Sequence, residues 1–440
     1  MALSFNEFVH DLAFGDLPED IRALPAWAVL DLVGIGSGGA GMPVSRIIRD
    51  HAAAHFGAGA KSARMLFDGR AVSPAGAALA GGMTIDALDG HDGYNVAKGH
   101  AGCGVLPAAL AYAEAEARDD GQEFLTAIVI GYEIACRAAV SLHASVPDYH
   151  TSGAWVAIAC AALGARALGL NSQQTRDAIG IAEYHGPRSQ MMRCIDHPTM
   201  VKDGSGWGAM AGVSAAYLAR DGFTGAPAIT VEADDVASYW AELGDTWLIA
   251  DQYYKPYPVC RWAQPPLQAV LDLRAEYSLT SDDVERIDVV TFHESVRLAK
   301  RHPVNTEEAQ YSTAFPTAAA MVRGTVGVDE VSPAAFGDPE ILRLAGSMTM
   351  AESDAYNASF PARRIAHVEL LLKDGRRLNS PPTEAEGDPQ TPPDEAARNA
   401  KFHALANPRF GVEKADRIKT CIMSLGDGGA VTDLTGLTAT

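Results

Sequence analysis

The residue types that could do chemistry are most concentrated between Asp86 and Pro107, in the segment DALDGHDGYNVAKGHAGCGVLP. This segment holds three carboxylates, two histidines, a lysine and a tyrosine among five glycines, and apolar runs lie on either side of it. Glycines let a backbone approach a ligand closely, and loops held by rigid elements are where binding groups gather. We therefore predict an ordered functional loop that leads into a helix. The alternative is an ordinary polar surface loop.

Two histidines are placed to act as bases. His100 closes the loop directly before a predicted helix, and His150 precedes the helix expected from Ala154. Backbone N–H groups at a helix N-terminus disfavour imidazolium, so we expect both side chains to be neutral and able to accept a proton near neutral pH. A purely structural role is the alternative for either histidine.

Lysine is rare through the middle of the chain. Between Lys61 and Lys300 it occurs only at Lys98, Lys202 and Lys255, each in a glycine- or proline-rich turn. In a chain with a formal net charge of −20, isolated cations held in turns suit anionic groups such as carboxylates. Salt bridges to nearby acidic residues are the alternative.

Composition excludes several function classes. The net charge of −20, with no cluster of lysines and arginines, argues against binding of nucleic acid or an anionic membrane. Six scattered cysteines without CxxC spacing predict reduced thiols, and the N-terminal residues lack the pattern of a signal peptide. No uninterrupted apolar run is expected to reach membrane-spanning length. We therefore predict a cytoplasmic protein.

Motifs for other chemistries are missing. The sequence contains no GxxxxGK[ST], HExxH or GxSxG, and GIGSGG follows a helical pattern instead of a strand. Asp86, Asp89, His91 and Asp92 could in principle ligate a divalent cation, but their spacing matches no known cage. We predict no bound metal and no cofactor.

The elements that must position these residues are mostly helices. Apolar periodicity predicts an almost wholly helical region up to residue 270, in which GIGSGG ends an early helix. Strands are predicted at Val284–Phe292 and Ala366–Leu372, the second followed by a tight turn at Asp374–Gly375. The predicted fold is mainly α with an α+β second domain. Residues 1–270 and 395–440 would form the helical domain, and residues 271–394 a smaller α/β lid domain.

Four blocks of the sequence resemble the MmgE/PrpD family. They are ALDGHD–x7–HAGCGVLPAALA, YHTSGAWVAIACAALGARALGL, VKDGSGWGAMAGVSAAYLARDGFTG and KPYPVCRWAQPPLQA. The resemblance implies a helical domain with an α/β lid domain, a homodimer without cofactor, and a small-molecule di-, tri- or tetracarboxylate substrate. It also implies removal of a proton next to a carboxylate, as a dehydratase, decarboxylase or epimerase would require.

The resemblance further implies which residues form the site. In substrate binding it implies Lys202, Lys255, Arg261 and Asp92. In catalysis it implies Asp89, His100 and His150, to which we add the neighbouring Lys98 and Tyr149. Lysines and an arginine would hold carboxylates, the arginine through a bidentate pair. Which residue acts as which base is left open.

Several positions depart from the family pattern. Gly93 replaces the usual threonine, Phe315 stands where a tyrosine is expected, and Tyr94 and Lys98 are additions to the loop. A site altered in this way favours a changed reaction. We therefore expect an epimerase, an isomerase acting on a multi-carboxylate such as iminodisuccinate by two-base proton transfer. The alternatives are a lyase of the 2-methylcitrate dehydratase or cis-aconitate decarboxylase type, or a non-catalytic carboxylate-binding protein.

Overall fold

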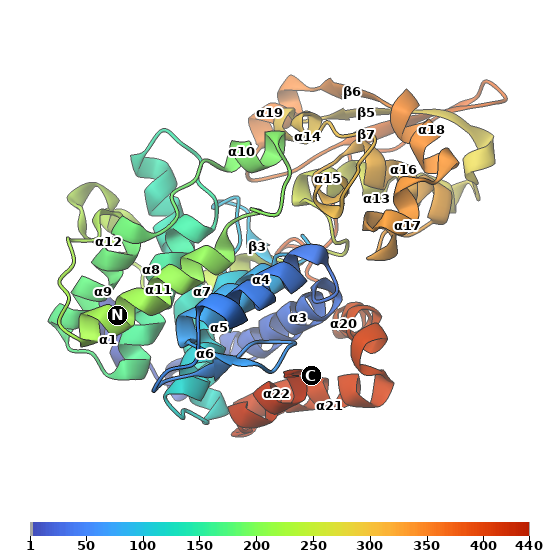
Figure 1. The fold of residues 1–440 in the computed structure, drawn as a ribbon. Coiled ribbons are helices and arrows are strands. Elements are labelled where there is room, and N and C mark those ends of the chain that lie inside the picture. Colours follow the sequence, from blue (N-terminus) through green and yellow to red (C-terminus); the bar gives the residue numbers. More distant parts are fainter. Residues whose placement is uncertain (1–2, 440) are drawn as a thin grey trace.

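The computed structural model describes residues 3–439. Figure 1 shows a large helical body with a smaller α/β unit beside it. The first and last helices, α1 (Phe5–His10) and α22 (Val431–Thr438), both lie on the helical body. The fold class predicted from the sequence, mainly α with a smaller α/β domain, is confirmed.

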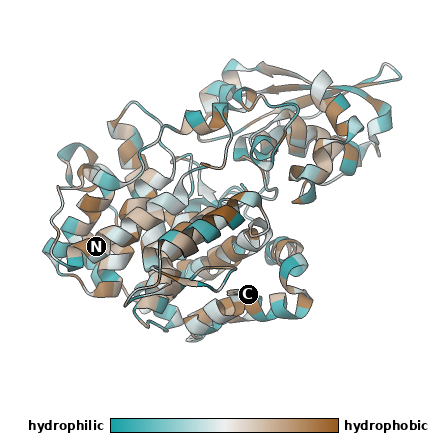
Figure 2. Cartoon of the chain, viewed as in Figure 1, coloured by the Kyte–Doolittle hydropathy of each residue, from teal (hydrophilic) through white to brown (hydrophobic). Residues whose placement is uncertain are grey.

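The helical body is built from packed helices with short connections. Its members up to residue 232 are α1, α2 (Glu19–Arg22), α3 (Leu24–Gly39), α4 (Pro43–His55), α5 (Pro74–Ile85), α6 (Gly102–Ala115), α7 (Gly121–Ser145), α8 (Gly153–Leu168), α9 (Ser172–His185), α10 (Met191–Asp196), α11 (Ser205–Arg220) and α12 (Ile229–Glu232). Helix α11 packs against α8, α5 and α9 at the centre of this bundle. Figure 2 shows hydrophobic residues spread through the body, with hydrophilic residues towards its outer ends.

Small residues let these helices approach closely. A methyl group at Gly212 of α11 would collide with the carbonyl oxygen of Ala157 in α8. The prediction that GIGSGG ends a helix is wrong, because α3 continues through these glycines to Gly39. Here too the glycines allow close packing. A methyl group at Gly39 would collide with the carbonyl oxygen of Thr84 in α5. The glycines therefore serve close packing between helices, a role that local propensity does not reveal.

The α/β unit contains a four-stranded mixed sheet in the order β6-β5-β7-β8. Its strands are β5 (Val284–Thr291), β6 (Thr349–Glu352), β7 (His367–Leu372) and β8 (Arg377–Asn379). Strand β5 pairs parallel with β6 (Asp288 opposite Thr349) and antiparallel with β7 (Val289 opposite Val368). The tight turn predicted at Asp374–Gly375 joins β7 to β8, with Gly375 at φ +89°. Strand β6 was not predicted, because it is short and largely exposed at the sheet edge.

Helices accompany this sheet. They are α13 (Gln264–Glu276), α14 (His293–Arg297), α15 (Thr306–Gln310), α16 (Ala314–Arg323), α17 (Pro333–Phe336), α18 (Pro339–Ser347) and α19 (Asp354–Ser359). Helix α13 packs on β7, α18 packs on β5, and α16 packs between α13 and α18. Buried and half-exposed residues alternate along β5 and β7, as expected for a sheet covered on one face.

The chain then returns to the helical body. Helix α20 (Glu395–Phe410) and α21 (Val412–Ser424) both pack against α3, and α22 packs against α6. Two short antiparallel pairs, β1 (Ala63–Arg64) with β2 (Ala71–Val72) and β3 (Gly93–Tyr94) with β4 (Gln252–Tyr253), fasten loops of the body. The second pair ties the chemistry-rich loop to the segment that precedes α13.

Charged residues interrupt every long apolar stretch, as expected, but two stretches still reach membrane-spanning length. The stretches Glu19–Gly39 and Gly121–Ser145 are both long and apolar enough to cross a membrane. Most residues of each are nevertheless buried inside the protein, which is how core helices of globular proteins pass the same test. Neighbouring helices cover them, among them α8 and α6 on α7 and α20 on α3.

Candidate active site

The chemistry-rich loop between α5 and α6 is buried, so the surface-loop alternative does not hold. Asp86, Asp89, His91 and Asp92 are each at most 2% exposed. Gly93 pairs with Tyr253 across β3 and β4. Burial of so many ionisable groups is costly unless they are paired or bind a ligand.

Gly93 explains one departure from the family pattern. A methyl group on this residue would lie against the hydroxyl of Tyr253 and 2.7 Å from Nδ1 of His100. The threonine usual in the family therefore has no room in this chain, where Tyr253 occupies the space beside His100.

His100 is held in one orientation with one ring nitrogen free. Its Nδ1 lies 2.5 Å from the carbonyl oxygen of Asp92, and its backbone N–H donates to the hydroxyl of Ser152. Because a carbonyl only accepts, Nδ1 carries the proton and Nε2 keeps a lone pair. Nε2 lies 3.6 Å from Oδ2 of Asp203 and 3.9 Å from Oδ1 of Asp89. Burial and the Lys255 ammonium hold the pKa of His100 well below its usual value, so it is a neutral base.

Two buried lysines supply positive charge to the same cluster. Lys255 forms an ion pair with Asp89, and Lys202 Nζ donates to Oε1 of Gln310 at 2.8 Å. The same oxygen accepts the backbone N–H of Asp89 at 2.8 Å. Burial raises the pKa of Asp89, but Lys255 and Lys202 outweigh it and hold that pKa well below its usual value. Lys202 has a left-handed backbone (φ +48°), a strain typical of functional sites.

Asp203 belongs to the site and was missed by sequence reasoning. It is 2% exposed, it accepts from the Ser152 hydroxyl at 2.9 Å, and its Oδ1 has no hydrogen-bond partner among residues 3–439. Burial, Asp86 and Asp89 raise the pKa of Asp203 to about 7. It can therefore donate or accept a proton near neutral pH. Its position directly after Lys202, in a glycine-rich turn before a helix, was the available signal.

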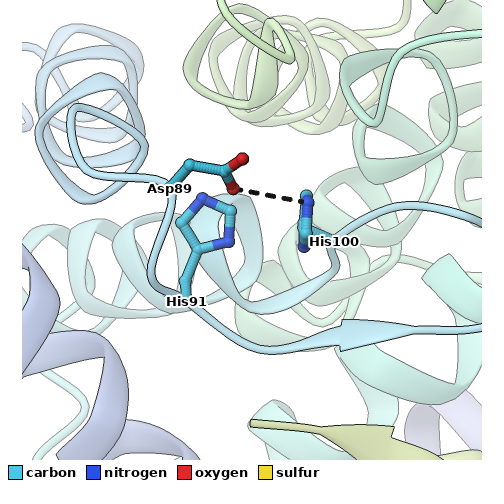
Figure 3. A group of neighbouring side chains, drawn as sticks. All are labelled: Asp89, His91 and His100. Atoms are coloured by element: carbon cyan, nitrogen blue, oxygen red, sulfur yellow. Dashed lines mark ion pairs between the residues drawn. The ribbon is translucent and has the colours of Figure 1, made fainter. Parts of the chain in front are cut away.

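Asp89, His91 and His100 form the one group among the described residues with a spacing suited to a metal ion (Figure 3). One ligand atom from each lies within 4.8 Å of the others, and the two rings meet edge to face at 4.3 Å. The Lys255 ammonium is already paired with the Asp89 carboxylate, which leaves a second cation poorly compensated. The Lys255 ammonium therefore supplies the positive charge that Asp89 needs, and the three residues do not fit a metal ion as well.

Lys98 and Tyr149 lie together, whereas His150 faces elsewhere. The Tyr149 hydroxyl donates to the carbonyl oxygen of Lys98, and the Lys98 ammonium lies 4.4 Å from the Tyr149 ring centre. Burial raises the pKa of Tyr149 and lowers that of Lys98. His150 Nδ1 donates to the carbonyl oxygen of Asp148 at 2.9 Å, and its ring stacks on that of His143. The structure thus places His150 beside the site loop without a direct contact to His100.

Asp92 and Arg261 are both engaged in holding the site together. Asp92 accepts from the hydroxyl of Tyr132, and burial raises its pKa to about 6. Arg261 pairs with Asp388 at 3.0 Å and donates to the carbonyl oxygens of Ala385 and Glu386. A role of either in substrate binding stays a prediction.

Phe315 is buried against Phe336 and brings no hydroxyl to the site. Another tyrosine is present, however, because the Tyr311 ring lies 4.8 Å from the Lys202 ammonium. Tyr311 and the preceding Gln310 were missed, since nothing in their local sequence signals a link to a loop more than 200 positions away.

Lys255 also borders a groove of about 1480 Å³ between the two parts of the chain. Its walls include Asp31 of α3, Lys401 of α20 and Asp388 from the segment before α20. The groove follows the junction of the helical body and the α/β unit, while the Lys255 side chain itself is buried beside it.

Comparison with known proteins agrees with this arrangement of two units. The MmgE/PrpD N-terminal domain matches residues 4–247, and the MmgE/PrpD C-terminal domain matches residues 257–427. The chain belongs to the MmgE/PrpD family.

Relatives within the MmgE/PrpD family are enzymes. The cis-aconitate decarboxylase-like protein oryM of Aspergillus oryzae is 23% identical, covering 98% of this chain and 95% of the relative. Cis-aconitate decarboxylase of Homo sapiens is also 23% identical, covering 96% and 91%. The mitochondrial 2-methylcitrate dehydratase of Yarrowia lipolytica is 25% identical over 51% of this chain and 47% of the relative. The named relatives are thus of the decarboxylase and dehydratase type, and nothing among them supports the expected epimerase.

Proposed function

We propose that this chain is a lyase acting on a small multi-carboxylate substrate. In dehydration, a base takes the proton beside a carboxylate, the C–H electron pair forms the double bond, and the C–O bond breaks as an acid protonates the leaving hydroxide. In decarboxylation, the C–C bond electrons stay on the substrate as CO₂ leaves, and an acid returns a proton to carbon. Decarboxylase relatives that match over more than nine-tenths of both chains support this proposal.

One observation carries the proposal at the level of residues. The free Nε2 of His100 lies 3.6 Å from Asp203, whose pKa is raised to about 7. A neutral base and a carboxyl group able to carry a proton therefore stand side by side. Dehydration needs this pairing, because one group takes a proton while a nearby group gives one, and decarboxylation needs only the group that gives a proton.

The buried lysines would stabilise the negative charge that develops on the substrate. Lys202 and Lys255 are each 1% exposed, so their charge acts in a medium of low dielectric. Cations fixed before the substrate arrives cost no reorganisation during the reaction. In this scheme Asp89 holds Lys255 in place, while His150, stacked on His143, and Arg261, paired with Asp388, would have to turn toward the substrate to bind it.

An epimerase is the second candidate. The pair formed by Lys98 and Tyr149 favours it, because it offers a second proton carrier from outside the His100 cluster. Two-base epimerisation needs carriers on opposite faces of one carbon. His100 and Asp203 are adjacent and would reach the same face of the reacting carbon. An epimerase would therefore depend on Lys98 or Tyr149 to exchange a proton at the opposite face.

Proton NMR in D₂O tests these candidates with cis-aconitate, 2-methylcitrate, citrate and iminodisuccinate. For a lyase we expect vinyl proton signals to appear or change, together with CO₂ measured separately for decarboxylation, or loss of the CH and CH₂ proton signals of the hydroxy acid for dehydration. Deuterium entering an α-carbon with scrambled stereochemistry, and no CO₂ or water lost, would establish the epimerase instead. Binding of these compounds without any proton exchange would mean a non-catalytic carboxylate-binding protein.

We also propose that the enzyme works as a homodimer without a cofactor, as the family resemblance implies, and that it is cytoplasmic, as its scattered cysteines indicate. Light scattering of the purified chain tests the oligomeric state, and dialysis against a chelator tests the cofactor. Unchanged turnover after dialysis is the expected result.

A further inference from the structure

Four arginines in the described part of the chain are buried, and one of them lacks a carboxylate. They are Arg49, Arg137, Arg261 and Arg364. The first three each have an aspartate or glutamate at ion-pair distance: Asp68, Glu133 and Asp388 respectively. Among residues 3–439, Arg364 has none, although it is only 3% exposed.

The contacts of Arg364 are neutral and incomplete. Its Nη1 donates to the side-chain oxygen of Asn95 and to the carbonyl oxygen of Pro361 at 3.0 Å. Its Nε has no hydrogen-bond partner among the described residues. Burying a guanidinium without a counter-charge is expensive, so a buried arginine in this state is suited to an anion that the protein itself does not supply.

The position of Arg364 connects it to the active site. It comes from the α/β unit, between α19 and β7, yet it contacts Asn95 in the site loop of the helical body. Its guanidinium carbon lies 5.7 Å from the centre of the Tyr253 ring, and that ring lies 6.3 Å from the ring of His100. Tyr253 thus separates Arg364 from the catalytic base by the thickness of one side chain.

The acidic charge that acts on Arg364 is that of Asp388, which is already paired with Arg261 at 3.0 Å. Arg261 also lies over the Tyr253 ring, at 4.9 Å, but it is paired with Asp388. Burial and the Arg261 charge lower the pKa of Arg364, against the opposing effect of Asp388, and the Arg364 charge contributes to the lowered pKa of Lys98. Two buried arginines on this side of Tyr253 thus share one carboxylate, which leaves Arg364 able to bind an anion.

We propose that Arg364 binds a third substrate carboxylate, while Lys202 and Lys255 serve the first two. This inference rests on the proposed function and narrows its substrate class to compounds with at least three carboxylates. The α/β unit would then contribute directly to substrate selection. Arginine suits the task, because its planar fork binds a carboxylate through two parallel hydrogen bonds.

Calorimetric titration with two unreactive probes tests this assignment. Tricarballylate carries three carboxylates, and glutarate is the same chain without the central one. Arg364→Gln is expected to weaken tricarballylate binding by about 10- to 100-fold, the usual effect of losing a charged hydrogen-bonded pair, and to leave glutarate binding unchanged. Equal loss for both probes, no loss for tricarballylate, or no binding of either probe by the wild type would overturn the assignment.

Arg363→Gln is the matched control. Arg363 is the adjacent residue, but it is exposed and pairs with Glu384. This variant is expected to bind both probes as the wild type does. If Arg364→Gln does not fold, a crystal structure of the wild type with tricarballylate decides instead. A carboxylate on the Arg364 guanidinium supports the assignment, and a ligand bound away from it refutes it.

The titration and the NMR assay can fail separately. Turnover of a tricarboxylate by Arg364→Gln with an unchanged KM would remove Arg364 and leave the lyase standing. Arg364-dependent tricarballylate binding without turnover of any compound would remove the lyase and leave the carboxylate site.

Discussion

At the scale of single residues, the site depends on how charge is fixed before a substrate arrives. His100 is kept neutral by burial and by Lys255, and Asp89 is kept ionised by the same lysine. One ammonium group therefore sets the protonation state of two neighbours. Exchange of Lys255 would alter the base and the acid cluster together.

We expect His100→Asn to lower kcat by about 10²- to 10⁴-fold, the usual loss for a general base. The asparagine amide can still donate to the carbonyl oxygen of Asp92, so the loop is expected to stay folded. Steady-state kinetics with the substrate identified by NMR measures the loss, and circular dichroism checks the fold. Turnover close to that of the wild type would exclude His100 as the base.

The pH dependence should report Asp203. Its pKa is raised to about 7, so the protonated form is lost as the pH rises through about 7, and a reaction that needs this acid slows there. The pKa of His100 lies well below its usual value, so His100 stays neutral over the same range. We expect kcat to fall on the alkaline side with an apparent pKa near 7.

Asp203→Asn provides the control for that profile. The variant is expected to be slow and to lack the alkaline fall, because asparagine does not titrate. A profile that still falls near pH 7 in this variant would assign the fall to another group.

At the scale of elements, much of the helical body could be predicted from apolar periodicity and caps. The region expected to be almost wholly helical up to residue 270 is built from packed helices, and β5 and β7 lie on the two predicted strands. GIGSGG was wrongly predicted to end a helix. Its glycines are there because Phe67 and Thr84, which are distant in sequence, pack too close to leave room for side chains. Strand β6 was missed because an exposed edge strand has little apolar pattern to detect.

The site was predictable where residues stood out by their type and local position, and not where only packing between the two units adds them. His100, Lys202 and Lys255 are drawn into one cluster, as their unusual positions suggested. Asp203 follows one of them directly and could have been found. Gln310 and Arg364 come from the other unit of the chain, and only the packing of that unit against the loop makes them part of the site.

The pairing of β3 with β4 gives an element-scale prediction. Gly93→Ala would press a methyl group against Tyr253 and His100, so we expect a stability loss of about 1–3 kcal/mol, typical of overpacking, together with reduced turnover. Urea unfolding measures the loss. Gly59→Ala is the control, because nothing lies within 4 Å of its added methyl group, and it is expected to change stability by less than about 0.5 kcal/mol.

At the scale of the whole molecule, the helical body carries the base and the lysines, while the α/β unit adds Gln310 and Arg364. Asn95 of the site loop also donates to Asp388, which lies near the end of the α/β unit. Polar contacts of this kind join the two units across the site. Relative movement of the units would therefore change the site itself.

The net charge and the buried lysines act on an anionic ligand in opposite directions. Outside the protein, a chain with a net charge of −20 repels a carboxylate over distances of about a Debye length. Inside the site, Lys202 and Lys255 attract it, and their burial protects that attraction from salt. The surface charge thus slows the approach of the ligand, while the buried lysines stabilise it once it is bound.

Added salt is therefore expected to speed the arrival of the substrate instead of slowing it. Stopped-flow binding of tricarballylate between about 10 and 300 mM salt should show a rising association rate constant, with a dissociation rate constant that changes little. A falling association rate constant would mean that a local cationic entrance dominates the far field. Such an enzyme would work best where the ionic strength is high enough to screen the repulsion between its negative surface and its substrate.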